Sequence, residues 1–110
     1  MAARATIKYI RVSPQRARMV ANLVRGKGTN EALSILKFTT TKGSRIIHRL
    51  VKSAVSNAAS SGKVDVDTLY IKTICVDSGP ILKRYTARAQ GRGSRINKRT
   101  SHIHVELAER

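Results

Sequence analysis

The stretch KRYTARAQGRGSRINKR, residues 83–99, decides how the rest of the chain is interpreted. It holds seven Lys and Arg, no acid, and almost nothing that could pack a core. Segments typical of strands flank it at residues 69–76 and 101–107. A loop of this length is uncommon inside a compact domain, unless it is functional or becomes ordered on a partner. We therefore interpret residues 78–100 as an extended β-hairpin of a single domain that spans residues 1–110.

The predicted hairpin is too long to lie against its own domain. With a tip near residues 90–93, each arm has about ten residues and reaches roughly 30 Å, at about 3.3 Å per residue. A globule of about this chain length has a radius of gyration of only about 13 Å. The two arms also repel each other, because no acid lies between Asp77 and Glu106. We expect a polyanionic partner to hold the hairpin.

The charge of the chain indicates nucleic acid as that partner. The 110 residues include 22 Lys and Arg against 6 Asp and Glu, which gives a net charge of +16. This excess is far beyond what solubility requires. The one cysteine, Cys75, excludes an internal disulfide, suits a reducing cytosol, and is predicted to be buried among apolar neighbours. Since neither a signal peptide nor a membrane-spanning apolar run is recognisable, we expect a soluble cytoplasmic protein.

Apolar periodicity predicts two short helices near the N-terminus. The first spans residues 14–25, with the hydroxyl of Ser13 as its cap. The second ends at about residue 38 and is capped by Thr29 or Asn30. The residues predicted to face the core are Ala17, Val20, Leu23 and Val24 in the first helix, and Ala32, Leu33, Leu36 and Phe38 in the second.

A third helix and three strands complete the predicted domain. Over about residues 41–60, apolar residues recur at four-residue steps and basic residues take the other face. Strands are predicted at residues 5–12, 69–76 and 101–107, and the last alternates apolar with polar positions. The predicted fold is α+β: a small antiparallel three-stranded sheet packed against three helices, with a long protruding β-hairpin. The predicted core positions are Ile46, Ile47, Leu50, Val51, Ala54, Val55, Ala58 and Ala59 in the helix, and Ile103, Val105 and Leu107 in the strand.

Arginine and lysine at recurring positions predict the RNA contacts. A planar guanidinium holds phosphate through two hydrogen bonds or stacks on a base. At the start of the first helix, free amides add to the attraction for phosphate. The predicted RNA-binding residues are Arg11, Gln15, Arg16, Arg18, Arg25 and Lys27 in the N-terminal part, and Lys83, Arg84, Arg88, Arg92, Arg95, Lys98 and Arg99 in the hairpin.

Little in the sequence supports other chemistry. The turn at residues 26–29 lacks the spacing of a nucleotide-binding loop, so we interpret it as structural, with Lys27 meeting RNA backbone. His102 and His104 point to the same side of a strand, but no third metal ligand accompanies them. No acid and base pair and no activated nucleophile can be assembled. We predict neither a cofactor nor a metal, and a protein that is not an enzyme.

Two alternatives stay open at this point. A DNA-bending architectural protein also uses basic hairpin arms, but it requires an apolar side chain at the tip that wedges between bases, and a dimer interface. Here the tip is Gln90-Gly91-Arg92. An RNA-processing enzyme lacks a recognisable catalytic constellation and is the weaker alternative.

Four segments resemble those of one protein family. They are SPQRARMVANLVRGK at residues 13–27, SAVSNAASS at 53–61, VDSGPILKR at 76–84 and ARAQGRGSRINKRTSHIHV at 87–105. The last two, in this order, are highly specific. Over nearly its whole length, the chain resembles the bacterial large-subunit ribosomal protein L twenty-two family.

The resemblance implies a role for each part of the chain. The globular part would sit on the outer face of the large subunit near the exit of the nascent-chain tunnel. The hairpin would pass inward through the large ribosomal RNA and form part of the tunnel wall, opposite ribosomal protein L four and close to the macrolide site. Ala87 stands where the family often has proline and Gly93 where it often has alanine, which predicts a looser tip. The tunnel-facing tip would be Arg88, Ala89, Gln90, Gly91 and Arg92.

Overall fold

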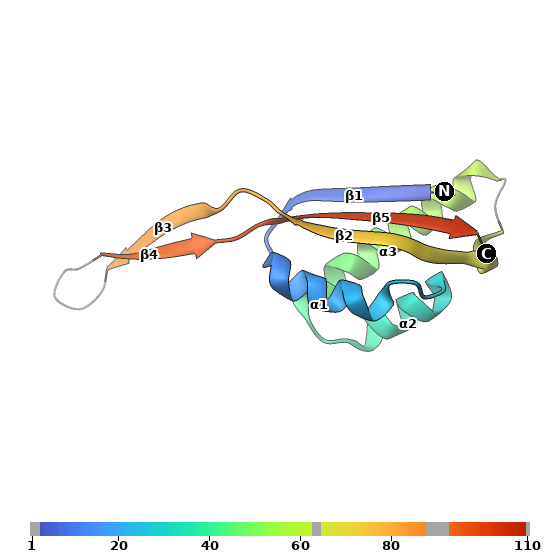
Figure 1. Cartoon of the computed structure of the whole chain (residues 1–110), viewed down its shortest axis with the longest axis horizontal. Coiled ribbons are helices and arrows are strands. Elements are labelled where there is room, and N and C mark those ends of the chain that lie inside the picture. The colour runs from blue at the N-terminus through green and yellow to red at the C-terminus, as the bar shows by residue number, and fades with distance from the viewer. Residues whose placement is uncertain (1–2, 63–64, 88–92, 110) are drawn as a thin grey trace.

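A computed structural model describes residues 3–62, 65–87 and 93–109 of the chain (Figure 1). It contains three helices and a three-stranded antiparallel sheet, so the predicted α+β class is confirmed. In chain order the elements are β1 (Ala3–Ile10), α1 (Pro14–Val24), α2 (Thr29–Phe38), α3 (Lys42–Ser61), the 3-10 turn η1 (Val66–Thr68), β2 (Leu69–Ser78), β3 (Leu82–Ala87), β4 (Gly93–Lys98) and β5 (Ser101–Glu109).

The last strand, β5, lies at the centre of the main sheet. It pairs antiparallel with β1 on one side and with β2 on the other. Successive side chains of a strand point to opposite faces, and here Ile103, Val105 and Leu107 are fully buried while the residues between them are not. The alternation predicted for this strand is confirmed.

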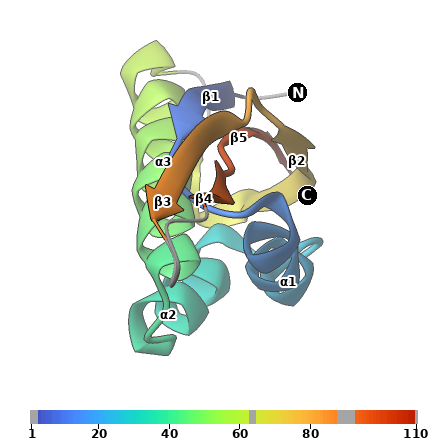
Figure 2. The ribbon, with the colours of Figure 1, turned by 90° about the vertical axis from the view of Figure 1, so that its left-hand side faces the viewer.

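The three helices cover one face of the sheet, as Figures 1 and 2 show. The predicted stripe of α3 forms much of the core, with Ile47, Leu50, Val51, Ala54 and Ala58 all buried. This long helix has a capping box at its start, where Thr41 and Ser44 satisfy each other's backbone amides. It ends at Gly62, whose φ of 68° is in the left-handed region that glycine adopts without strain.

Several residues predicted to be buried are exposed instead. Leu23 is 50% exposed and Phe38 is 80% exposed, because each lies off the buried side of its helix. In α1 the buried side includes Ala21, and not Leu23 as predicted. Ala59 is also exposed. Cys75 is exposed because it lies between the buried Ile74 and Val76 and therefore faces the other side of the sheet. A register shift between Ile71 and Thr73 lets Ile71 and Ile74 face the same side despite their spacing.

The caps of the two short helices also differ from prediction. Ser13 precedes α1, but its side chain makes no capping hydrogen bond. In α2 the N-cap is Gly28, and Thr29 is the first helical residue and is buried. Thr29 is already inside the helix, so its hydroxyl packs in the interior and does not cap.

Beyond the main sheet, β3 and β4 form a separate two-stranded antiparallel sheet, which we call the arm. Its register runs from Leu82 opposite Lys98 to Ala87 opposite Gly93. The remaining described residues form the body, and the arm extends away from it (Figure 1). The molecule measures 63 × 24 × 17 Å and has a radius of gyration of 16.9 Å, against about 13 Å for a compact chain of similar length. The predicted tip, residues 88–92, lies outside the described residues.

Candidate nucleic-acid interface

Residues 79–81 and 99–100 connect the arm to the body, and we call them the root. The amide of Gly79 donates to the carbonyl of Thr100 at 2.9 Å, and the hydroxyl of Thr100 donates to the carbonyl of Pro80 at 2.6 Å. A Cβ atom on Gly79 would stand 2.5 Å from the Thr100 hydroxyl, so any larger residue would force the side chain of Thr100 away from its bond to Pro80. These contacts fix the direction in which the arm leaves the body.

The segment just before α1 is attached to the same root. Arg11 donates from Nη1 to the carbonyl of Arg99 at 2.7 Å. The hydroxyl of Ser101, which is fully buried, donates to the carbonyl of Val12 at 2.6 Å. Two residues predicted to bind RNA, Arg11 and Arg99, are thus brought together although they are 88 positions apart in the chain.

A groove of about 720 Å³ lies between α1 and the start of α3, and sequence reasoning missed it. The groove is largely apolar, and the exposed side chains of Met19 and Leu23 form part of its lining. Three cations also line it: Arg11, Arg16 and Lys42. Its signal in the sequence was Leu23, which periodicity had assigned to the core.

Arg18 and Arg25 have a structural role that was not predicted. Arg18 donates from Nε to the carbonyl of Val76 at 3.0 Å, and Arg25 donates from Nη2 to the carbonyl of Ile74 at 2.8 Å. Both carbonyls belong to β2, which is an edge strand of the main sheet. An open edge is a template for unwanted strand pairing, and the two arginines cover part of it. A guanidinium has five N–H donors, so donors are left over for a second partner.

The glycine turn after α1 continues this cover of the β2 edge. The amide of Gly26 donates to the carbonyl of Ile71 at 3.0 Å, and the amide of Ile71 donates to the carbonyl of Lys27 at 2.9 Å. Gly26 has a φ of 79°, which favours glycine. The side chain of Lys27 lies 3.8 Å from Glu31, in an exposed ion pair that contributes little to stability. The backbone contacts account for the turn.

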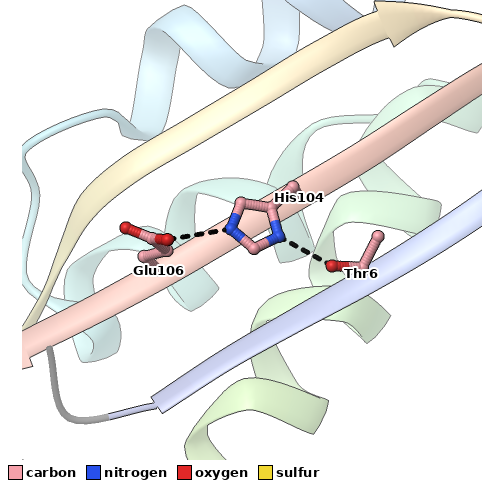
Figure 3. Close-up of polar contacts among 3 residues, drawn as sticks. All are labelled: Thr6, His104 and Glu106. Atoms are coloured by element: carbon pink, nitrogen blue, oxygen red, sulfur yellow. Dashed lines mark hydrogen bonds and ion pairs between the residues drawn. The ribbon is translucent and has the colours of Figure 1, made fainter.

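Three polar side chains interact on the face of the main sheet that is turned away from the helices (Figure 3). His104 lies with Nδ1 2.7 Å from the hydroxyl of Thr6 and with Nε2 3.1 Å from a carboxylate oxygen of Glu106. The hydrogen bond from His104 lowers the pKa of the Glu106 carboxyl, although desolvation opposes the shift. Within the ranges that the structure describes, no group of three metal-ligating side chains is found.

The second histidine of that strand supports a bulge in β1. The register of β1 shifts between Ile7 and Ile10, and Tyr9 adopts a φ of 58°, which is rare for an aromatic residue. His102 accepts the amide of Tyr9 at Nδ1 over 3.0 Å, and the two rings meet edge to face with centroids 4.8 Å apart. Both histidines therefore have structural contacts within the main sheet.

The remaining predicted residues fall into two groups. Gln15 and Arg16 are exposed on the first turn of α1, and Lys83, Lys98 and Arg99 are exposed on the arm and its root. Arg84 and Arg95 belong to β3 and β4, whereas Arg88 and Arg92 lie outside the described residues. None of the described helices is both long and apolar enough to span a membrane.

Comparison with known proteins supplies a family for this arrangement. The chain is 52% identical over 110 residues to the large ribosomal subunit protein uL22 of Syntrophotalea carbinolica, with both chains covered completely. The protein of the same name from Geobacter metallireducens is 48% identical, again over the full length of both chains. For Myxococcus xanthus uL22, the identity is 50% over 111 residues, covering 99% of this chain and 97% of that protein.

A family model matches almost the whole chain as well. It is described as ribosomal protein L22p/L17e and covers residues 5–108. The match includes the body, the root and both strands of the arm. Because the family is one of structural ribosomal proteins, it confirms the prediction that the chain is not an enzyme. The chain belongs to the ribosomal protein L22p/L17e family.

Proposed function

We propose that the chain is a structural constituent of the large ribosomal subunit, that it binds the RNA of that subunit, and that it resides with the ribosome in the cytoplasm. Its relatives are named for the large ribosomal subunit. The observation that carries RNA binding is the arm, because a basic two-stranded extension projects away from the body (Figure 1). A two-stranded sheet alone is marginal in water. Packing of the arm into RNA supplies the missing contacts.

The mechanism is electrostatic and depends on shape. Cations at the root and at the start of α1 neutralise phosphates, while the arm enters between RNA segments and ties them together, which assists assembly. Arg18 and Arg25 contribute through the donors that β2 does not use. The proposed contacts are Arg11, Gln15, Arg16 and Lys27 in the body, Arg99 at the root, and Lys83, Arg84, Arg88, Arg92, Arg95 and Lys98 along the arm and its predicted tip.

The proposal extends to the tip of the arm. The chain forms a single domain, with residues 78–100 as its extension. The tip of this extension lines the nascent-chain tunnel near ribosomal protein L four, and it consists of Arg88, Ala89, Gln90, Gly91 and Arg92. The elongated shape supports this role, since the longest dimension is more than twice either of the others. A photoreactive side chain in place of Gln90 should crosslink to ribosomal RNA or to a nascent chain in translating ribosomes. Crosslinks to neither would contradict the tunnel position.

Fractionation tests the ribosomal role itself. The tagged chain is expressed in a bacterium, and the lysate is separated on a sucrose gradient under conditions that dissociate the two subunits. Nearly all of the protein should travel with the large subunit. If most of it stays at the top of the gradient, or sediments with DNA, the proposed function is wrong.

A further inference from the structure

The corner where α2 meets α3 has an uncompensated positive charge that the proposed contacts leave unused. Between Glu31 and Asp65 the chain has no acid. The cations Lys37, Lys42, Arg45, Arg49 and Lys52 are all exposed, and within the described residues none of them forms an ion pair. A solvated helix face normally mixes both signs of charge. The single sign here indicates an anionic partner.

The four cations of α3 lie in a row. Lys42, Arg45, Arg49 and Lys52 follow one another at steps of three or four residues, which places them on the same side of the helix. At 1.5 Å per residue the row is about 15 Å long. An extended polyanion can therefore contact several of these side chains at once.

Phe38 adds an aromatic surface to this corner. It is the last residue of α2 and the only phenylalanine of the chain, and it is 80% exposed. The exposed Tyr9 at least packs its ring against His102. Among the described residues Phe38 has no aromatic partner. A single exposed apolar side chain is common on protein surfaces, so this ring becomes informative through the cations and the depression at the same corner.

A depression of about 330 Å³ lies at the end of α2, where Phe38 stands in the chain between two of its lining residues. It is lined by Leu36 and by polar or charged side chains, among them the chain neighbours of Phe38, Lys37 and Thr39. The opposite wall comes from the first turns of α3, which lie next to α2 (Figure 2). The polar and charged lining residues are Lys37, Thr39, Thr40, Arg45, His48 and Arg49. Hydroxyls, an imidazole and three cations around one hollow suit a ligand with both phosphate and hydrogen-bonding edges.

We propose that this corner is a second RNA-binding site, in which an unpaired base stacks on Phe38 and the flanking phosphates contact Lys37, Arg45 and Arg49. Exposed aromatic rings beside cations are how proteins bind unpaired nucleotides. An acidic protein would neutralise the cations equally well, but the exposed ring of Phe38 at the same corner favours a base. The site rests on the proposed function, because it requires that the chain binds RNA at all. Through this site the body binds an RNA segment in addition to the one that the arm contacts.

Binding assays with substituted full-length chains test the site. The probe is deproteinised large-subunit RNA from a bacterium at fixed salt. Loss of one stacked base corresponds to roughly a 5- to 150-fold weaker affinity, so we expect Phe38→Ala to fall in that range and Phe38→Tyr to keep nearly full affinity. Arg45→Gln should weaken binding more than Lys52→Gln, which changes a cation outside the depression. Folding is a minor concern, since all three side chains are exposed.

The outcomes separate this site from the proposed function. If the unsubstituted chain does not bind the RNA, the proposed function fails as well. If it binds and Phe38→Ala binds equally well, only the second site is refuted. In reconstituted large subunits, a photoreactive benzoylphenylalanine in place of Phe38 should crosslink to RNA. Crosslinking to a protein would assign the corner to a protein contact and would overturn the inference.

Discussion

The body and the arm of this molecule are ordered by different forces. The body buries a continuous core of aliphatic side chains between α1, α2, α3 and the sheet. The arm has backbone pairing between β3 and β4, and two apolar residues where it joins the body, Ile81 of the root and Leu82 of β3, are exposed. Hydrophobic burial is the main favourable term in folding. The body therefore carries the stability of the chain, whereas the arm depends on contacts with the RNA into which we propose it packs.

The largest expected effect lies in the body. Leu50 is 6% exposed in the middle of the buried stripe of α3, and Leu50→Ala should destabilise the fold by about 2 to 5 kcal/mol. Its neighbour Arg49 is exposed, so Arg49→Ala should change stability by less than about 0.5 kcal/mol. Urea denaturation followed by circular dichroism measures both. Equal losses would mean that the helix buries a different face.

The junction of the two regions comes next. Gly79→Ala places a Cβ atom 2.5 Å from the Thr100 hydroxyl and should cost about 1 to 3 kcal/mol through overpacking. The control is Gly43→Ala in α3, where the new Cβ atom would have only ordinary contacts at 3.6 Å or more. Because alanine favours a helix over glycine, this control should be neutral or stabilising by up to about 1 kcal/mol. A harmless Gly79→Ala would show that the root is looser than its contacts indicate.

Two arginines of one helix, both proposed to contact RNA, should differ in their effect on stability. Arg18→Ala removes the hydrogen bond to the β2 carbonyl of Val76 and should cost about 0.5 to 1.5 kcal/mol. Arg16→Ala should leave stability unchanged, but should reduce the slope of log affinity against log salt by about 0.7 to 0.9, the value for one phosphate contact. Denaturation curves and RNA titrations at several salt concentrations test both. Equal stability of the two variants would show that the hydrogen bond from Arg18 to Val76 does not stabilise the fold.

A smaller effect concerns pH. Folding lowers the pKa of Glu106, chiefly through the hydrogen bond from His104. The ionised carboxylate therefore stabilises the folded chain at pH values above the usual carboxyl range, and this stabilisation is lost as the pH falls through the lowered pKa. Stability should therefore decrease toward acid pH less steeply in Glu106→Gln than in the unsubstituted chain. Urea denaturation between about pH 7 and pH 3 measures the slope. The control is Glu109→Gln, at the exposed end of the same strand, and equal slopes in the two variants would argue against the His104 contact.

Periodicity in the sequence was sufficient to predict the helices and strands that bury one face and expose the other. The stripe of α3 and the alternation of β5 were predicted because burial repeats there at the period of the element. Leu23 and Phe38 were misassigned because an apolar residue beside a short stripe looks like a member of it. Cys75 was misassigned because its apolar neighbours suggested burial, whereas alternation with the buried Ile74 and Val76 turns it to the other face of the sheet.

Contacts between distant segments were beyond sequence reasoning. The basic character of Arg18 and Arg25 was recognised, but nothing local indicates that they bind carbonyls of β2 that lie 58 and 49 positions away. The groove between α1 and α3 depends on packing in the same way. The charges of Arg11 and Arg99 were visible in the sequence. That the guanidinium of Arg11 binds the backbone carbonyl of Arg99 at the root required the fold.

Shortening the arm tests most directly whether the body carries the stability. Arg84 and Ile96 are paired in register, so a two-residue turn can replace residues 85–95 and join them as a tight hairpin. We expect the shortened chain to melt within about 5 °C of the full chain and still to enter large subunits, because the body and the root are intact. A melting temperature lowered by more than about 5 °C, roughly 1 kcal/mol for a domain of this size, would contradict this expectation.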